Sequence, residues 1–555
     1  MNKSEEYCVN HSQLSRRGML KASLSGGLAT VSAWASWNES LASSKPAFAA
    51  QPFDLDEVTI SELQNGLRSQ RLTARSIAEK YLTRIEALDH RGPTLRSIIE
   101  VNPDALAMAD ALDKERKENG ARGPLHGIPV VIKDNIDTAD RMATTAGSLA
   151  LVGSSAPQDA FLVQNLRRAG VVLLGKTNLS EWANIRSSHS ISGWSGRGGL
   201  TKNPFALDRN TSGSSSGSAV AVTANLCAVA VGTETDGSIV SPSSVNGIVG
   251  IKPTVGLISR SGVIPISHTQ DSAGPMARTV RDAAILLSAL AGVDTEDPAT
   301  KAGRGKAIGD YTQFLDPKGL QGMRIGVVRK LFGFHEAVNE LMNEALACVK
   351  HHGATLIDLA DTGTLELFRE SEETVLLYEL KADLNLYLAR RGSATAVHTL
   401  KQVIEFNERN KKSEMPYFGQ DLFLKAEAKG PLTDQEYREA LRKNLRLGRT
   451  EGIDAVMDRL QLDALVAPTD GPAWLTDLVD GDHYLGSSSM PAAVAGYPSI
   501  TVPAGFFFGL PVGISFFGRA WSEPLLLRAA YAFEQATKHR KPPQFLETVG
   551  GRAQI

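Results

Sequence analysis

The sequence predicts an α/β protein with a mostly parallel, buried β-sheet. Short runs of β-branched and aliphatic residues alternate with helical patterns along most of the chain, which is typical of this fold class. The composition, 42% hydrophobic and 22% charged residues, is that of an ordinary globular protein. With 555 residues, the chain is long enough for one large domain or up to about three.

The expected elements begin after residue 50. Thr59-x-x-Glu62 is a capping-box pattern that opens a helix, and a second amphipathic helix is expected over Thr73–Leu88. Later helices are expected over residues 159–169, Val338–Lys350 and Glu523–Ala536. Apolar and β-branched runs predict strands over Val130–Ile132, Val171–Leu174, Cys227–Val231, Met323–Val328, Thr355–Leu359, Ala464–Ala467, Ser499–Val502 and Val512–Phe517.

The stretch from about residue 364 to residue 459 differs from the rest of the chain. It is charged, mainly helical in period, and contains no convincing strand pattern. We expect it to be a helical insertion within a single domain that spans residues 50–555. The insertion either covers the cleft and shapes the substrate site, or forms a solvated helical appendage.

The first 49 residues have the pattern of a twin-arginine export signal. Arg16 and Arg17 precede a weakly apolar segment over Ala22–Trp37, and Ala47-Phe48-Ala49 follows as a cleavage pattern. Glycines and serines interrupt the apolar segment, so a membrane-spanning helix is not expected. The pattern predicts transient contact with the twin-arginine export machinery and a periplasmic or secreted bacterial location. The alternative is a disordered tail whose paired arginines are accidental.

Charge and cysteine content exclude several classes of function. The formal net charge is −2, so the chain has no basic field for nucleic acid and no polybasic face for a membrane. It has three cysteines, no CxxC motif and no histidine cluster at metal-ligand spacing. We therefore expect no disulfide framework, no metal site and no cofactor.

Two clusters of small residues and one lysine carry the candidate chemistry. The clusters are Gly213–Gly217 and Gly232–Ile239, and they are separated by mostly apolar residues. Small residues allow the backbone to approach a ligand closely, and hydroxyl groups in such places are candidate nucleophiles. Lys133 ends the apolar run Gly127–Ile132. Hydroxyl groups together with a lysine flanked by apolar residues indicate nucleophilic catalysis with an amine as the base.

The two clusters differ in their local context. Gly213–Gly217 satisfies the G-x-S-x-G pattern of a nucleophile elbow, but a polar loop precedes it where that motif needs a buried strand, which argues against Ser215 as the nucleophile. Gly232 follows the apolar run Cys227–Val231. A strand that opens into such a turn can direct several backbone N–H groups at one point, as an oxyanion hole requires. Ser238 would then attack a carbonyl carbon.

Together these residues resemble the amidase signature family. The resemblance spans nearly all of residues 55–540. It implies a single α/β domain around a large mixed sheet with helices on both faces. The matching segments are Gly127–Asp134, Gly175–Glu181, the serine cluster, Gly232–Ile239, Gly247–Thr254, Asp271–Arg278 and Gly513–Phe516.

The resemblance implies a Ser-cisSer-Lys triad made of Ser238, Ser214 and Lys133, with a cis peptide bond before Ser214. Lys133 must be neutral to accept a proton, and burial lowers the pKa of a lysine. By the same resemblance, the proton of Ser214 passes to Lys133 and that of Ser238 to Ser214, and Ser238 forms an acyl-enzyme that water hydrolyses. The family's oxyanion hole falls on the backbone amides of Thr235, Asp236, Gly237 and Ser238.

Departures from the family pattern point to one branch of it. Asp236 and Val240 stand where glycine and arginine are usual, and Ser212 and Ser216 also replace glycines. With Trp182–Asn184, Ser190–Ser195 and Arg197–Gly199, these residues are similar to bacterial peptide amidases, which hydrolyse the C-terminal carboxamide of peptides.

Four other functions remain as alternatives. Two keep the amidase chemistry: a broad aryl or aliphatic amidase, and the amidase subunit of a glutamine-dependent amidotransferase. The other two are a noncatalytic binding protein on the same scaffold and an α/β-hydrolase esterase that uses Ser215 with a histidine. Retention of Lys133 and both triad serines argues against the noncatalytic protein.

Overall fold

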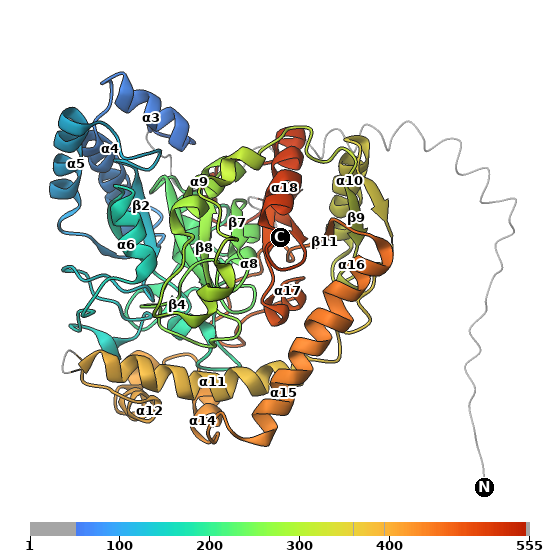
Figure 1. The fold of residues 1–555 in the computed structure, drawn as a ribbon. Helices are drawn as coiled ribbons and strands as arrows, with labels where there is room; N and C mark the ends of the chain where they lie inside the picture. Colours follow the sequence, from blue (N-terminus) through green and yellow to red (C-terminus); the bar gives the residue numbers. More distant parts are fainter. Residues whose placement is uncertain (1–51, 359, 393–394, 551–555) are drawn as a thin grey trace, which may run out of the picture. The chain divides into compact units, whose positions relative to one another are not determined.

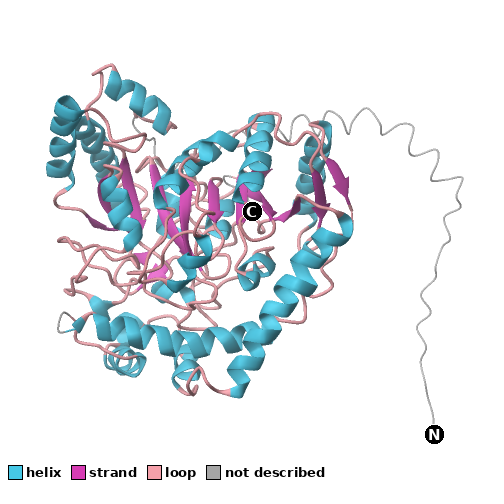
Figure 2. Ribbon diagram, viewed as in Figure 1, coloured by secondary structure: helices cyan, strands magenta, loops and turns pink. Residues whose placement is uncertain are grey.

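One mixed sheet of eleven strands forms the centre of the fold within the described part of the chain (Figures 1 and 2). The computed structural model describes residues 52–358, 360–392 and 395–550. The export signal expected at residues 1–49 therefore lies outside the described residues. The strands of the sheet are β1 (Ile98–Val101), β2 (Pro129–Lys133), β3 (Val172–Thr177), β6 (Val229–Glu234), β7 (Val249–Lys252), β8 (Ser272–Ala277), β9 (Arg324–Val327), β10 (Thr355–Ile357), β11 (Ala464–Pro468), β12 (Ser499–Phe507) and β13 (Leu510–Phe517).

The sheet is mixed, as expected, but it is not mostly parallel. Its strand order is β1-β3-β2-β6-β8-β7-β12-β13-β11-β9-β10. The pairs β3–β2, β2–β6, β11–β9 and β9–β10 are parallel, and the other six pairs are antiparallel. The expectation of a mostly parallel sheet is corrected because β7 and β8, which the sequence patterns did not reveal, insert antiparallel strands at its centre. β8 contains Gly274 and Pro275, residues that are depleted in strands.

Helices cover both faces of the sheet. On β12 and β13, the apolar side chains of Ile500 and Phe516 join one core with Phe533 of the C-terminal helix. The opposite face is polar, where the Gly513 N–H donates to Ser244 Oγ at 2.8 Å. The helices are α3 (Ile60–Arg68), α4 (Ala74–Arg84), α5 (Ala105–Asn119), α6 (Phe161–Arg168), α7 (Ser216–Thr223), α8 (Val240–Val245), α9 (Val280–Leu290), α10 (Glu336–His351), α11 (Arg369–Arg390), α12 (Leu400–Arg409), α13 (Lys411–Glu414), α14 (Asp421–Glu427), α15 (Gln435–Leu445), α16 (Asp454–Leu460), α17 (Met490–Ala495) and α18 (Glu523–Thr537).

Local sequence signals account for several of these boundaries. The Thr59 capping box forms: its hydroxyl accepts the Glu62 N–H, and the Glu62 carboxylate accepts the Thr59 N–H at 2.8 Å. The helix expected over Thr73–Leu88 is α4, and Thr73 caps it in the same way. α4 ends at Arg84, and a π-helical turn follows over Ile85–His90. These ends are set by short-range hydrogen bonds, which is why the sequence predicts them well.

The charged stretch after residue 364 is helical from α11 to α16 in the residues described there. In Figure 1, α11 and α15 lie together beneath the strands, in yellow and orange. Leu365, Arg369 and Leu376 of this stretch line the cavity described below. Throughout the described ranges, none of the helices combines the length and apolarity needed to span a bilayer.

Candidate active site

Lys133 is the last residue of β2, and its side chain is fully buried. Its Nζ lies 2.7 Å from Ser214 Oγ and 3.1 Å from Ser215 Oγ. On the neighbouring strand β6, Thr233 contributes its carbonyl oxygen at 3.1 Å and its hydroxyl at 2.9 Å. The sheet therefore places the lysine amine against both serines of the first cluster.

Burial decides the protonation of this amine. Removal from water lowers the pKa of Lys133 from 10.5 to about 7, although the charges of Glu234 and Asp271 oppose the change. None of the four contacts on Nζ is a carboxylate, and hydroxyl and carbonyl groups can accommodate a neutral amine. Lys133 is thus held where a substantial neutral fraction exists near pH 7.

Ser214 lies in the turn that leads into α7, and it is fully buried. The Gly213–Ser214 peptide bond is cis, as the resemblance implied. The next residue, Ser215, donates its backbone N–H to the carbonyl oxygen of Ser238 at 3.1 Å. The backbones of the two serine clusters are therefore in direct contact, although 24 residues separate Ser214 from Ser238.

The second cluster forms a turn between β6 and α8. Gly237 has φ +77, a left-handed conformation that glycine adopts without steric cost. The carboxylate of Glu234 accepts the N–H groups of Ile239 at 2.7 Å and of Val240 at 2.9 Å. On the other side, the Thr235 hydroxyl donates to Asp271 at 2.6 Å. Two buried carboxyl groups thus fix the turn that presents Ser238.

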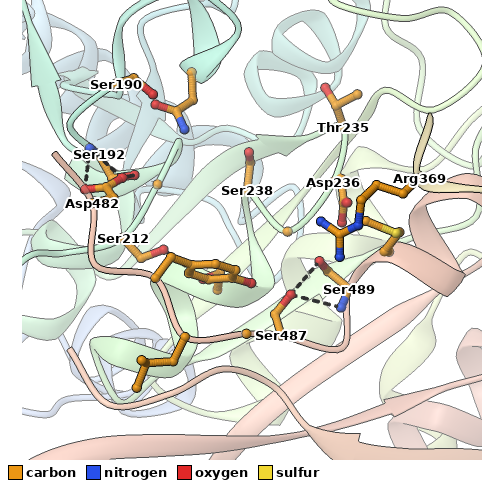
Figure 3. A pocket seen from close by; sticks show the side chains of 18 of the residues that line it. Ser190, Ser192, Ser212, Thr235, Asp236, Ser238, Arg369, Asp482, Ser487 and Ser489 are labelled. Atoms are coloured by element: carbon orange, nitrogen blue, oxygen red, sulfur yellow. Dashed lines mark hydrogen bonds between the residues drawn. The ribbon is translucent and has the colours of Figure 1, made fainter. Parts of the chain in front are cut away.

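This turn opens into a cavity of about 890 Å³. Thr235, Asp236, Gly237 and Ser238 all line it, and Figure 3 shows the Ser238 hydroxyl directed into the space. The other walls are formed by the segments Ala183–Ser192, Lys330–Phe334, Trp474–Met490 and the start of α11. The cavity is therefore the place where a substrate can reach Ser238.

The structure places the three expected residues in one region, two of them behind the cavity wall and one on it. Lys133 and Ser214 are hydrogen-bonded behind the cavity wall, and Ser238 is on the wall itself. In the described chain, no hydrogen bond joins the side chains of Ser214 and Ser238. Catalytic hydrogen bonds are often long in ligand-free structures and tighten when substrate binds.

Ser215 is not placed to attack a substrate. Its hydroxyl donates to the Thr233 carbonyl oxygen at 2.9 Å, and the residue is fully buried outside the cavity lining. Among the described residues, no histidine is hydrogen-bonded to it. His126, which lies near the motif of Lys133, contacts the Leu112 carbonyl oxygen at 2.9 Å and is structural. The geometry thus disfavours an esterase that uses Ser215.

Asp236 places a carboxyl group in the turn where the family usually has glycine. Burial raises its pKa to about 6, and the charge of Glu234 acts in the same direction. Its Oδ1 is buried and has no hydrogen-bond partner among the described residues. The turn therefore carries a buried carboxyl group beside the cavity.

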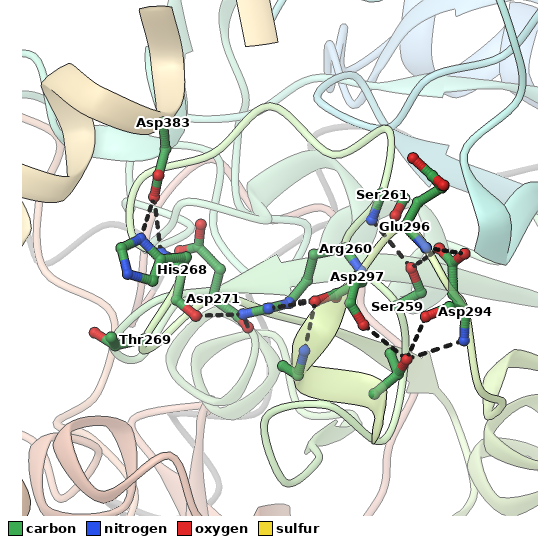
Figure 4. Close-up of polar contacts among 12 residues, drawn as sticks. Ser259, Arg260, Ser261, His268, Thr269, Asp271, Asp294, Glu296, Asp297 and Asp383 are labelled. Atoms are coloured by element: carbon green, nitrogen blue, oxygen red, sulfur yellow. Dashed lines mark hydrogen bonds and ion pairs between the residues drawn. The ribbon is translucent and has the colours of Figure 1, made fainter. Parts of the chain in front are cut away.

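Sequence reasoning did not identify the role of Asp271, which lies about 30 residues beyond the turn. Its second oxygen accepts the backbone N–H groups of Ile266 at 2.8 Å and Ser267 at 2.9 Å. The same loop carries His268, whose Nδ1 lies 2.8 Å from the Asp383 carboxylate on α11 (Figure 4). Asp271 is the first residue of the segment Asp271–Arg278, which carries part of the family resemblance. That position was the sequence signal that could have identified it.

In the described residues, His268, Glu379 and Asp383 lie close enough together that their side chains could hold a metal ion, although no metal site was expected from the sequence. Both oxygens of Glu379 already accept hydrogen bonds, one from Tyr437 OH at 2.7 Å and the other from Thr269 at 2.9 Å. None of the three residues lines the cavity. The group therefore fits a hydrogen-bonded link between a loop and α11.

Comparison with known proteins places the chain in a family. The Amidase family model matches residues 76–527. The crystal structure of native peptide amidase from Stenotrophomonas maltophilia is 50% identical, with a TM-score of 0.85, and the match covers 89% of this chain and 100% of that one.

Three curated relatives show how widely the similarity extends. A probable amidase of Arabidopsis thaliana is 45% identical, covering 89% of this chain and 93% of the relative. A putative amidase of Schizosaccharomyces pombe is 38% identical, covering 91% and 89%. A glutamyl-tRNA(Gln) amidotransferase subunit of Symbiobacterium thermophilum is 34% identical, covering 87% and 97%.

These relatives correct one expectation. The periplasmic or secreted bacterial location is wrong, because the amidases at 45% and 38% identity come from a plant and a fungus. The pattern that suggested this location lies in residues 1–49, outside the described part of the chain. The family match covers residues 76–527 and does not depend on that segment. Because of this match, the chain belongs to the Amidase family and is a hydrolase that acts on amide C–N bonds.

Proposed function

We propose that this chain hydrolyses the C-terminal carboxamide of peptides to a carboxylic acid and ammonia, with Ser238 as the nucleophile. The observation that carries the proposal is the buried contact of 2.7 Å between Lys133 Nζ and Ser214 Oγ, behind a turn that presents Ser238 to the cavity. An amine with a lowered pKa next to a hydroxyl group is a general base in position to activate a second hydroxyl group.

The reaction proceeds in two half-reactions. Neutral Lys133 takes the proton of Ser214, Ser214 takes that of Ser238, and a bond forms between Ser238 Oγ and the carboxamide carbon. The proton then returns along the same path to the nitrogen, the C–N bond breaks, and ammonia leaves. Water, activated by the same groups, attacks the acyl-enzyme and releases the acid, which restores Ser238.

The turn supplies electrostatic stabilisation for the negative charge that develops on the carbonyl oxygen. The donors in this proposal are the backbone N–H groups of Thr235, Asp236, Gly237 and Ser238, residues that all line the cavity. Glu234 and Asp271 hold the turn from both sides, so the donors need little reorganisation during the reaction. One such donor contributes about 2.7–4 kcal/mol to transition-state binding.

The size and lining of the cavity support a peptide as the acyl group. At about 890 Å³, it is much larger than a small aliphatic amide requires. Aromatic and apolar walls from Phe332, Phe334, Trp474 and Tyr484 alternate with serine hydroxyl groups, which suits side chains and backbone groups together. The likeness to peptide amidase from Stenotrophomonas maltophilia points the same way.

The test is a panel of N-acylated amino-acid amides, dipeptide amides, and small aryl and aliphatic amides, with ammonia as the product measured. We expect kcat/KM to be highest for the peptide amides. Turnover of only the small amides would contradict the peptide preference and leave the amidase chemistry intact.

Variants test the assignment of the residues in the same assay. Ser238→Ala and Lys133→Ala should each reduce kcat by at least about a hundredfold, whereas Ser215→Ala removes one contact with the lysine and should retain catalysis at a reduced rate. An inactive Ser215→Ala protein beside a fully active Ser238→Ala protein would refute the assignment.

A further inference from the structure

A second chain of hydrogen bonds runs from a buried carboxylate to the cavity wall, and the proposed reaction does not use it. The Ser241 hydroxyl donates to Asp470 Oδ2, and Ser212 Oγ lies 2.7 Å from Ser241 Oγ. Asp470 is 1% exposed, while Ser241 and Ser212 both line the cavity. Its members come from three segments that are far apart in the sequence.

When Asp470 is ionised, the donors and acceptors along this series of hydrogen bonds are fixed. A carboxylate only accepts hydrogen bonds, so Ser241 must donate to it. Ser241 then has lone pairs for its other neighbour, and Ser212 donates its proton to Ser241. The remaining lone pairs of Ser212 Oγ are therefore available as acceptors, and the side chain lies on the cavity wall (Figure 3).

The backbone around these serines is held firmly. The Ser212 N–H donates to Asn210 Oδ1 at 2.7 Å, and the Ser216 hydroxyl donates to the Ser212 carbonyl oxygen at 2.6 Å. The Ser241 N–H donates to the Gly237 carbonyl oxygen at 2.8 Å, one helical turn from the nucleophile. The acceptor is thus fixed relative to Ser238 and the oxyanion turn.

We propose that Ser212, oriented by Ser241 and Asp470, accepts the N–H of the substrate residue that bears the scissile carboxamide. This proposal rests on the proposed hydrolysis of peptide amides and names a residue that determines specificity within it. In a peptide amide, that N–H is the backbone donor nearest to the carboxamide carbon. Ser212 is two residues before Ser214, and it is hydrogen-bonded to Ser241, which lies one helical turn after Ser238, so this fixed acceptor is suitably placed for that N–H.

Another carboxylate on the wall is already occupied. Asp482 accepts the Ser192 hydroxyl at 2.6 Å, the Ser192 N–H at 3.0 Å and the Trp474 Nε1–H at 3.2 Å (Figure 3). These bonds join two loops of the cavity wall. Asp482 is therefore assigned to the structure of the wall.

The experiment uses two isosteric substrates. One is an N-acylated amino-acid amide, and the other is its ester analogue, in which an oxygen atom replaces the N–H next to the residue that bears the carboxamide. Ammonia release gives kcat/KM for both at about pH 8.5. Burial raises the pKa of Asp470 to about 7, so its carboxyl group is ionised at that higher pH. The wild-type protein should prefer the N–H substrate about tenfold, since the ester leaves the acceptor unpaired.

Two variants change the acceptor in different ways. Ser212→Gly removes the hydroxyl group at φ +55, a conformation that glycine tolerates, so the tenfold preference should disappear while folding is retained. Asp470→Asn should invert the preference. Because Gly471 donates its N–H to Asp470 Oδ1 at 2.7 Å, the amide oxygen of the asparagine must face Gly471 and its NH2 must face Ser241. The asparagine NH2 then donates to Ser241, Ser241 donates to Ser212, and Ser212 donates its own proton to the substrate.

Ser243→Ala is the matched control, because it removes a buried hydroxyl group from the helix that carries Ser241, and this hydroxyl has no hydrogen-bond partner among the described residues and does not line the cavity. It should leave the ratio of the two kcat/KM values unchanged. A tenfold preference that survives in Ser212→Gly, or an equal loss on both substrates in Asp470→Asn, would overturn the proposal. If the wild-type protein hydrolyses neither substrate, the proposed function fails; if it hydrolyses both equally, only the assignment of Ser212 fails.

Discussion

The pH dependence of kcat/KM should report the neutral form of Lys133. Burial lowers the pKa of this lysine from 10.5 to about 7, a difference that corresponds to about 5 kcal/mol between its charged and neutral forms. At pH 7 about half of the protein then carries a neutral amine, whereas an ordinary lysine would be neutral in about 0.03% of molecules. Burial therefore increases the reactive population about a thousandfold.

The direction of the profile follows from the role of the base. The active form is neutral, so activity is present above the pKa of the folded protein and is lost as the pH falls through it. We expect kcat/KM on a peptide amide to rise about tenfold per pH unit below pH 7 and to level off above it. Initial rates of ammonia release between about pH 5 and pH 10 measure this rising part of the profile, the acidic limb.

Two controls assign the limb to the lysine. Asp470 also has a raised pKa, of about 7, so the limb should persist in Asp470→Asn. The residual activity of Lys133→Ala should not show it. A midpoint near pH 10 in the wild-type protein, or the same limb in Lys133→Ala, would refute the argument that burial creates the base.

Three further predictions concern catalysis and stability. Ser238→Ala should accumulate no acyl-enzyme by mass spectrometry with a slowly hydrolysed substrate, while the wild-type protein gains the acyl mass; an acylated variant would mean that another group is the nucleophile. Lys133→Met should raise the free energy of unfolding in urea at pH 7, because the wild-type protein must bury an amine that is protonated when unfolded; this advantage should shrink towards pH 10, and a difference that does not change with pH would contradict it. Arg186→Met should lower that free energy by about 3–5 kcal/mol, since Arg186 forms a fully buried ion pair with Glu181 at 2.7 Å, and a change below about 1 kcal/mol would show that the pair is dispensable.

The outcome for Ser215 and Ser238 shows how far motifs alone could go. Both serines follow glycine-rich patterns, and the sequence favoured Ser238 because a buried strand precedes its cluster. The structure supports that choice through exposure: Ser238 is on the cavity wall, and Ser215 is buried beneath it. Exposure depends on which segments pack above each residue, and no local pattern contains that information.

The amino-acid sequence by itself determined the α/β class and most of the strands, because these depend on local periodicity. Its motifs, through their resemblance to a known family, singled out Lys133, Ser214 and Ser238 as candidates. Only the tertiary structure decided that antiparallel strands occupy the middle of the sheet, that Asp271 holds the turn that carries Ser238, and that Asp470 reaches the cavity through two hydroxyl groups. Asp271 lies about 35 residues after its partner Thr235, and Asp470 lies about 230 residues after its partner Ser241. Contacts at such separations arise from the order of strands in the sheet, which long-range packing sets.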